Sequence, residues 1–272
     1  MVWAKGGWLG AYGGMGALDF AGGIVVHITC GVSALVAAWM IGPRRKYPQS
    51  LSAPHNVPFI LLGAGLLWFG WFGFNAGSAL AANGVATYAF INTNTGAASG
   101  IVTWLLLEVF LRGKPTAVGA ASGAIAGLAG ITPAAGFVEP LAALLIGSFI
   151  AVCCFYAISL KAKLQFDDSL DTFPVHGVAG TIGAILTGIF ATTKVNPGAA
   201  NGLLYGNANQ LFIQLTAVII TYIISAAGTF ILLKIIEATV GLRPAPEAEI
   251  KGMDINEHGE EGYGEEFTGS LN

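Results

Sequence analysis

The chain has 272 residues, of which 54% are hydrophobic and only 10% are charged, and its mean hydropathy is +0.70. A soluble protein of this length needs more charge to cover its surface, so the composition excludes an ordinary soluble domain and indicates an integral membrane protein. The net charge of -3 says little about partners because the acidic residues gather near the C-terminus, and no nucleic-acid partner is expected.

Seven apolar segments are candidate transmembrane helices, since a bilayer core of about 30 Å requires about 20 apolar residues. They lie near 19–41, 57–80, 86–111, 116–135, 138–160, 172–192 and 209–239. The fourth is short and rich in small residues, so we expect it to be buried among its neighbours. Within it, Gly119, Gly123 and Gly127 are spaced to form a helix–helix contact face. The last segment is long enough to leave the membrane as a continuous helix.

Basic residues are distributed unevenly over the connections. Cytoplasmic loops carry an excess of Lys and Arg, and if the spans alternate, the following ten of the twelve lie on one side: Arg44, Arg45, Lys46, Arg112, Lys114, Lys161, Lys163, Lys234, Arg243 and Lys251. Only Lys5 and Lys194 lie on the other. We therefore predict a multi-pass cell-membrane protein with its N-terminus outside and its C-terminus in the cytoplasm. Residues 1–18 lack the basic start and the apolar run of a cleavable signal peptide. Because an outside N-terminus without such a signal is unusual, we also expect further spans upstream.

The predicted division is a helical membrane domain over 1–241 and an acidic tail over 242–272. The tail contains eight acidic residues against two basic ones. A solvated extension is one interpretation of this pattern, and a regulatory or docking segment is the other.

Two histidines, His27 and His176, lie inside apolar segments, and each follows an aspartate, Asp19 or Asp168, by eight residues. Eight residues of helix advance about 12 Å, so each histidine should lie somewhat short of the bilayer midplane. The first segment enters from outside and the sixth from the cytoplasm. This is the pattern of an inverted repeat, which places a shared site near the midplane. We therefore expect the two imidazoles to meet.

An ionisable side chain at membrane depth is costly and by default marks a pathway or a proton relay. Neutral imidazole offers one donor and one acceptor and titrates near neutral pH. These properties favour a pathway role for the histidine pair over a purely structural one. For Asp19 and Asp168 we prefer capping of helix N-termini over catalysis. No catalytic residue is assigned, and the chain is not expected to be an enzyme.

A metal site is the rival interpretation of the two histidines. It is weak because no third ligand is expected nearby, so neither a metal nor a cofactor is predicted. Cys30, Cys153 and Cys154 all fall in apolar segments and are interpreted as buried small hydrophobes, without a disulfide framework.

Bulky rings and glycines dominate the end of the second span, Trp68-Phe-Gly-Trp-Phe-Gly-Phe-Asn-Ala-Gly-Ser78. An aromatic stripe at this depth is normally packing or an interfacial belt. The alternative is an aromatic cage with a hydroxyl, which attracts a small cation through cation–π interaction. Trp3 and Trp8 are expected at the same outer face and could contribute to such a cage.

These motifs resemble the ammonium transporter family (Amt/Mep, related to Rh proteins). Asp19-Phe-Ala-Gly-Gly-Ile-Val-Val-His27, Phe74-Asn-Ala-Gly-Ser78 and Asp167-Asp-Ser-Leu-Asp-Thr-Phe-Pro-Val-His-Gly-Val-Ala-Gly180 look like its signature segments. Gly241-Leu-Arg and Asp254-Ile-Asn-Glu-His-Gly-Glu-Glu261 are similar to its cytoplasmic regulatory segment. The likeness covers essentially the whole chain.

The resemblance implies an ammonium transporter that works as a homotrimer with one pore per subunit. Ammonium would be recruited outside and deprotonated there, and ammonia would cross an apolar pore. His27 and His176 would line this pore and relay the proton, while Asp19 and Asp168 would support the site structurally.

The same resemblance implies an external recruitment site made of Ser78 and a tryptophan. Trp3 is the better candidate from its sequence setting, with Trp8 as the open alternative. Phe74 would be one of two stacked phenylalanines that gate the pore, and the tail would bind a PII-type signal protein.

Family members have eleven spans, and this chain matches the last seven. We therefore expect it to be the C-terminal part of a transporter that conducts poorly or not at all as a lone copy. Three alternatives are a neutral-gas channel of the Rh type, a sensor or signalling partner that acts through its tail, and a structural remnant.

Overall fold

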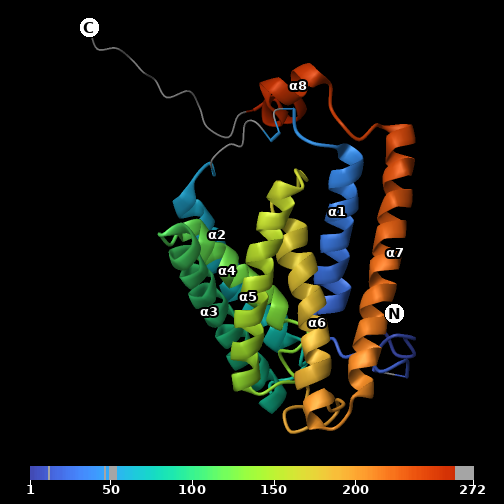
Figure 1. Cartoon of the computed structure of the whole chain (residues 1–272). Helices are drawn as coiled ribbons and strands as arrows, with labels where there is room; N and C mark the ends of the chain where they lie inside the picture. Colours follow the sequence, from blue (N-terminus) through green and yellow to red (C-terminus); the bar gives the residue numbers. More distant parts are fainter. Residues whose placement is uncertain (12, 46, 49–53, 261–272) are drawn as a thin grey trace. The chain divides into compact units, whose positions relative to one another are not determined.

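The computed structural model describes residues 1–11, 13–45, 47–48 and 54–260, and its regular structure is helical (Figure 1). The expected all-α class is confirmed over these residues. Lys46 of the predicted basic cluster lies outside them. In chain order the elements are η1 Gly23–Ile28, α1 Thr29–Ile41, α2 Val57–Gly77, α3 Gly84–Arg112, α4 Ala117–Ile131, α5 Pro140–Lys163, η2 Phe173–Gly177, α6 Val178–Phe190, η3 Leu203–Tyr205, α7 Asn209–Thr239, α8 Pro246–Lys251 and η4 Asp254–His258.

Six helices of the described chain are long and apolar enough to cross a membrane. They are Gly23–Ile41, Val57–Gly77, Gly84–Arg112, Pro140–Lys163, Phe173–Phe190 and Asn209–Thr239. The segment predicted at 116–135 forms α4, whose 15 residues fall short of the length that a bilayer core requires. A seventh crossing therefore stays a prediction.

α4 packs against α2, α3, α5 and α6, which confirms that this small-residue helix is buried among its neighbours. The predicted glycine face is also confirmed, because its members lie against α3. A Cβ on Gly123 would lie 2.9 Å from the carbonyl oxygen of Gly100, and one on Gly127 would overlap the carbonyl of Gly96. Dispersion contacts between closely approaching backbones are what stabilise such an interface, since lipid is as apolar as the side chains it replaces.

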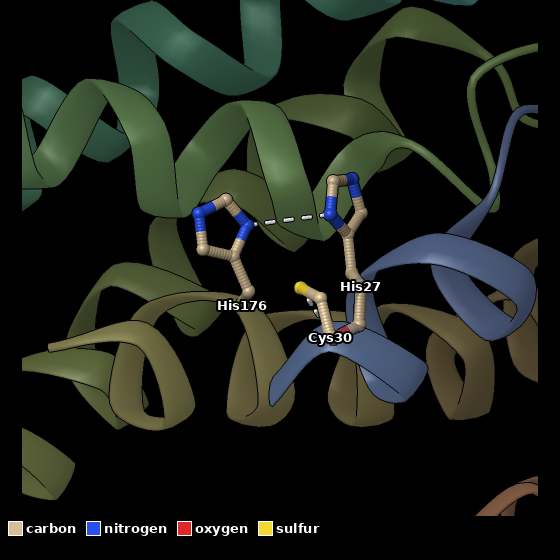
Figure 2. Close-up of side chains that lie close together, drawn as sticks. All are labelled: His27, Cys30 and His176. Atoms are coloured by element: carbon tan, nitrogen blue, oxygen red, sulfur yellow. Dashed lines mark hydrogen bonds between the residues drawn. The ribbon is translucent and has the colours of Figure 1, made fainter. Parts of the chain in front are cut away.

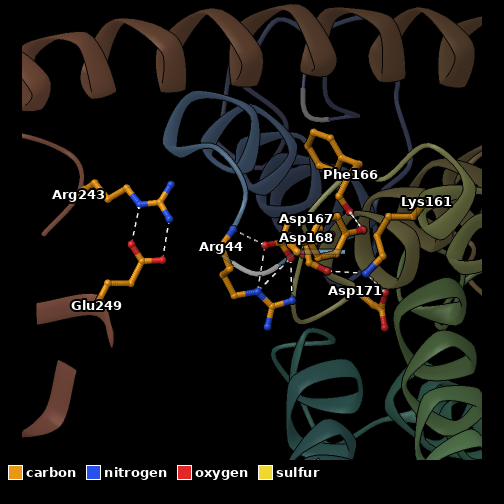
Figure 3. Close-up of polar contacts among 9 residues, drawn as sticks. Arg44, Lys161, Phe166, Asp167, Asp168, Asp171, Arg243 and Glu249 are labelled. Carbon is orange, nitrogen blue, oxygen red and sulfur yellow. Dashed lines mark hydrogen bonds and ion pairs between the residues drawn. The ribbon is translucent and has the colours of Figure 1, made fainter. Parts of the chain in front are cut away.

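The chain divides into two compact units, Met1–Phe230 and Ile231–Asn272. The boundary between the units falls inside α7. In it, Arg243 and Glu249 form an ion pair of 2.6 Å (Figure 3). The described part of the predicted tail thus contains local helical structure, whereas its last residues, including Glu261, lie outside the described part. The functional division at 241/242 stays a prediction.

An ion pair joins the segment after α1 to the loop between α5 and η2 (Figure 3). The backbone N–H of Arg44 donates to Asp167 Oδ2 at 2.7 Å, and its Nη2 donates to Oδ1 at 2.7 Å. The Asp167 side chain is only 3% exposed although Arg44 is half exposed. The two loops therefore lie at the same end of their helices, as the alternating topology predicts.

Packing at the α3–α4 contact can be tested with alanine. Gly100→Ala should destabilise the chain by about 1–3 kcal/mol, because its Cβ would overlap the Gly123 carbonyl and the backbones must separate. Gly65→Ala in α2 is the matched control, since its Cβ would meet nothing within 4 Å. There the loss of glycine from a helix should be neutral or stabilising, by up to about 1 kcal/mol. Thermal unfolding in detergent measures both; equal destabilisation would contradict the packing argument.

Acidification should weaken the Arg44–Asp167 contact. Hydrogen bonding from Arg44 lowers the pKa of Asp167 below its ordinary value of 3.8. A lowered folded-state pKa gives stability that is fully present above the unfolded value and is lost as pH falls through the folded value.

Asp167→Asn should therefore cost about 0.5–1 kcal/mol at pH 7, and this difference from the wild type should shrink as pH falls through the lowered pKa of Asp167. Denaturant unfolding in micelles between pH 3 and pH 7 measures it. Glu237→Gln, which removes the exposed pair with Lys234, should stay within about 0.5 kcal/mol of the wild type throughout. A pH-independent cost of Asp167→Asn would contradict this account.

Candidate functional site

The carboxylate of Asp19 caps the helix that carries the first histidine. Its two oxygens accept hydrogen bonds from the backbone N–H groups of Gly22, Gly23, Ile24 and Val25, at 2.6–3.1 Å. These are the amides that the start of a helix leaves without partners, and burial makes their satisfaction obligatory. The capping role expected for Asp19 is confirmed.

His27 and His176 both lie in π-helical segments that continue directly into α-helices: η1 into α1, and η2 into α6. Their Nδ1 atoms lie 3.3 Å apart, with ring centroids 5.3 Å apart and ring planes at 27° (Figure 2). His27 is only 3% exposed. The expected meeting of the two imidazoles is confirmed.

Glycine allows the two histidine-bearing helices to approach this closely. A Cβ on Gly31 would overlap the backbone of Gly177, and a Cβ on Gly180 would lie 2.7 Å from Cβ of His27. Each position is one turn from a histidine on its own helix. The spacing of the imidazoles therefore depends on backbone contact at these two glycines.

Asp168 accepts fewer backbone hydrogen bonds than Asp19. It is buried, and its Oδ2 accepts one backbone N–H, that of Phe173 at 2.8 Å. The Lys161 ammonium donates to its carbonyl oxygen and pairs with Asp171 (Figure 3). Capping is therefore confirmed at one amide, and the two aspartates are not equivalent.

The histidine pair faces an open cavity of about 680 Å³. Its wall is almost entirely apolar and includes Leu66, Leu67, Trp71 and Phe74 of α2. Trp71 stacks on His27 with centroids 5.4 Å apart, and its indole N–H donates to Thr132. Trp71 was not among the site residues predicted from the sequence, although it lies one turn before Phe74 in the aromatic segment.

Of Phe74, Ser78 and Trp3, Phe74 alone belongs to the lining of this cavity. Phe74 lines it, with its ring 6.1 Å from that of His27. The Ser78 hydroxyl donates to the carbonyl oxygen of Phe74 at 2.8 Å, at the end of α2. The Trp3 indole donates to the carbonyl oxygen of Asp19 at 2.7 Å while the side chain stays 46% exposed. The choice between Trp3 and Trp8 as the recruiting tryptophan stays a prediction.

Cys30 brings a third potential metal ligand to the pair. One ligand atom from each of Cys30, His27 and His176 lies within 4.8 Å of the other two. The expectation that no third ligand lies near the two histidines is therefore wrong. The signal was present, because Cys30 follows His27 by three residues and so lies on the same face of the helix.

The family described as the Ammonium Transporter Family matches residues 1–263. The ammonium transporter of Bacillus subtilis (strain 168) is 51% identical over 263 residues, which are 96% of this chain and 64% of the relative. Ammonium transporter Amt1 of Archaeoglobus fulgidus is 47% identical over 258 residues, 95% of this chain and 64% of its own length. The chain thus spans less than two thirds of these relatives.

Solved structures agree with this assignment. The crystal structure of Saccharomyces cerevisiae Mep2 superposes with a TM-score of 0.82 at 40% identity, covering 89% of this chain and 57% of that one. A structure described as "Sensor Amt Protein" gives a TM-score of 0.79 at 34% identity, with coverage of 90% and 61%. With six apolar helices and a family match over almost its whole length, the chain is a multi-pass membrane protein and belongs to the ammonium transporter family.

Proposed function

We propose that this chain carries ammonium across the membrane, and that the pathway passes the histidine pair. The observation that carries the proposal is the 3.3 Å contact between the two Nδ1 atoms at the wall of an apolar cavity. A cavity lined by leucine and aromatic side chains would impose a heavy desolvation cost on bare ammonium. Neutral ammonia avoids that cost, so the proton and the ammonia separate before the cavity.

The paired rings supply a route for the separated proton. Each neutral imidazole has one N–H and one bare nitrogen, so a single proton lies between the two facing Nδ1 atoms. A proton taken up at the bare Nε2 of the first ring makes that ring an imidazolium. Its Nδ1 proton then passes to the second ring, which releases the proton on its own Nε2 and is neutral again. Nε2 of His27 is buried without a hydrogen-bond partner among the described residues, and in this proposal it exchanges a proton with ammonia or ammonium that reaches it.

The residues around the cavity take supporting roles in this proposal. Trp3 and Ser78 recruit ammonium through a π-face and a hydroxyl oxygen. Phe74 gates the route between them and His27. Asp19 is a positioning residue, because its two oxygens are already engaged by four amides.

We also propose a cell-membrane orientation with the N-terminus outside, supported by the ten-to-two distribution of basic residues. Large apolar side chains on the described surface, such as Phe69 and Phe110, are about 80% exposed and suit contact with lipid or with other copies of a homotrimer. The tail beyond residue 241 would bind a PII-type signal protein.

The proposal is tested by uptake of labelled methylammonium into proteoliposomes that contain this chain. We expect slow uptake above that of empty liposomes, accompanied by a current on a supported membrane. His27→Leu/His176→Leu should reduce the current at least about tenfold, because an apolar wall cannot relay a proton. Cys153→Ala, in α5 and outside the cavity lining, is the control and should retain both signals.

Two results would contradict this proposal. Uptake equal to that of empty liposomes would exclude transport by this chain. Uptake without current in the wild type would instead indicate a neutral-gas channel of the Rh type, in which the histidines carry no proton.

The recruitment site is tested by comparing two tryptophans. Trp3→Leu should raise the half-saturating methylammonium concentration about 2- to 30-fold, which corresponds to a cation–π contribution of about 0.5–2 kcal/mol. Trp8→Leu should leave it unchanged, although Trp8 is equally exposed. The opposite ranking, with equal thermal stability of both variants, would move the site to Trp8.

A further inference from the structure

The two imidazoles and the Cys30 thiol converge on one position in the cavity wall. Figure 2 shows the sulfur beside the gap between the two rings, on the side of the helix backbones, with His27 and Cys30 on one helix and His176 on the other. All three residues line the cavity, and one ligand atom from each lies within 4.8 Å of the others. The cavity therefore gives an ion access to three donor atoms at once.

We propose that His27, Cys30 and His176 bind a single soft monovalent metal cation, of the Cu⁺ or Ag⁺ class. The nitrogens already have the required spacing. Two nitrogen ligands with metal bonds of about 2.0–2.1 Å at a tetrahedral angle lie about 3.3–3.4 Å apart, and the Nδ1 atoms are 3.3 Å apart. One ion can take the place of the proton between them once that proton has moved to Nε2 of the same ring, so that both histidines stay neutral.

The sulfur reaches the ion by a local movement. A metal–sulfur bond of about 2.3 Å would place Sγ about 3.5 Å from each nitrogen, compared with separations of up to 4.8 Å in the structure. Cys30 is only partly buried, and its thiol lies 3.4 Å from the carbonyl oxygen of its own helix at His27. Rotation about its Cα–Cβ bond exchanges this weak contact for the metal bond.

The donor set selects the class of ion. Thiolate and imidazole favour soft cations, whereas magnesium and calcium require oxygen ligands, and the three donors include none. On binding, the thiol releases its proton to water, so a monovalent ion and one thiolate give a neutral site. Neutrality avoids the cost of burying net charge among leucines and aromatic rings, a cost that a divalent ion would incur.

Metal binding does not depend on the proposed function. Its consequence does, because an ion between the rings would occupy the proposed proton route and close it. The experiments below measure metal binding itself, so they test the proposal even if the chain does not transport ammonium.

The first experiment measures retained metal. The full-length Cys153→Ala/Cys154→Ala variant keeps Cys30 as its one cysteine, and the same variant with Cys30→Ser is the matched control. Both keep the same four methionines. Each is incubated with Ag⁺ in detergent and desalted, and its silver is quantified by elemental mass spectrometry. We expect one equivalent on the first protein and at least about tenfold weaker binding on the second.

The second experiment identifies the ligands. X-ray absorption of the Cu⁺-loaded Cys30-only protein, prepared with a reductant that lacks thiols, should show one sulfur and two nitrogens. Equal silver retention by both variants would overturn the proposal, as would a copper site without nitrogen ligands. Serine preserves the shape of cysteine; if Cys30→Ser nevertheless lowers the unfolding temperature, His176→Gln in the Cys30-only background replaces it with the same expected loss.

Discussion

Four backbone amides converge on the single carboxylate of Asp19, and the position of His27 depends on this contact. In the apolar interior of a membrane protein, unsatisfied N–H groups cost several kcal/mol each. The carboxylate satisfies four of them and fixes where η1 begins, and this determines which residue one turn later faces the cavity. The indole of the half-exposed Trp3 donates to the carbonyl oxygen of Asp19. Asp19 therefore contacts an exposed side chain through its backbone and positions the buried His27 through its carboxylate.

The second histidine is positioned by a related but looser element. η1–α1 and η2–α6 each consist of a π-helical segment with a histidine followed by a 13-residue α-helix. A π-turn is wider than an α-turn and is often found at functional sites. Asp168 satisfies one amide where Asp19 satisfies four, and an ion pair between Lys161 and Asp171 holds its loop in place. This similarity supports the inverted-repeat interpretation, while the difference shows that the two copies are stabilised differently.

The features that could be predicted from the sequence are those whose side chains are costly to bury in an apolar chain, or are conspicuous there. Buried histidines, capping aspartates and a small-residue helix are all expensive or conspicuous in an apolar chain, so their pairing, capping and packing could be predicted. The length of α4 could not, because Thr132 and the residues after it continue as turns held by Asn92, whose amide donates to the carbonyls of Ala135 and Val138. The stacking of Trp71 on His27 could not be predicted either, since that contact depends on how α2 packs against η1 rather than on the sequence periodicity of α2.

The close approach of the two Nδ1 atoms also limits how many protons the pair can hold. If both rings were charged, facing nitrogens 3.3 Å apart would repel by about 5 kcal/mol at an effective dielectric constant of 20. If the pair takes up one extra proton, this repulsion disfavours a second, and the first must leave before the next is accepted. As the relay proposed above, the pair would pass protons one at a time, a limit set by the geometry of two rings rather than by a gate.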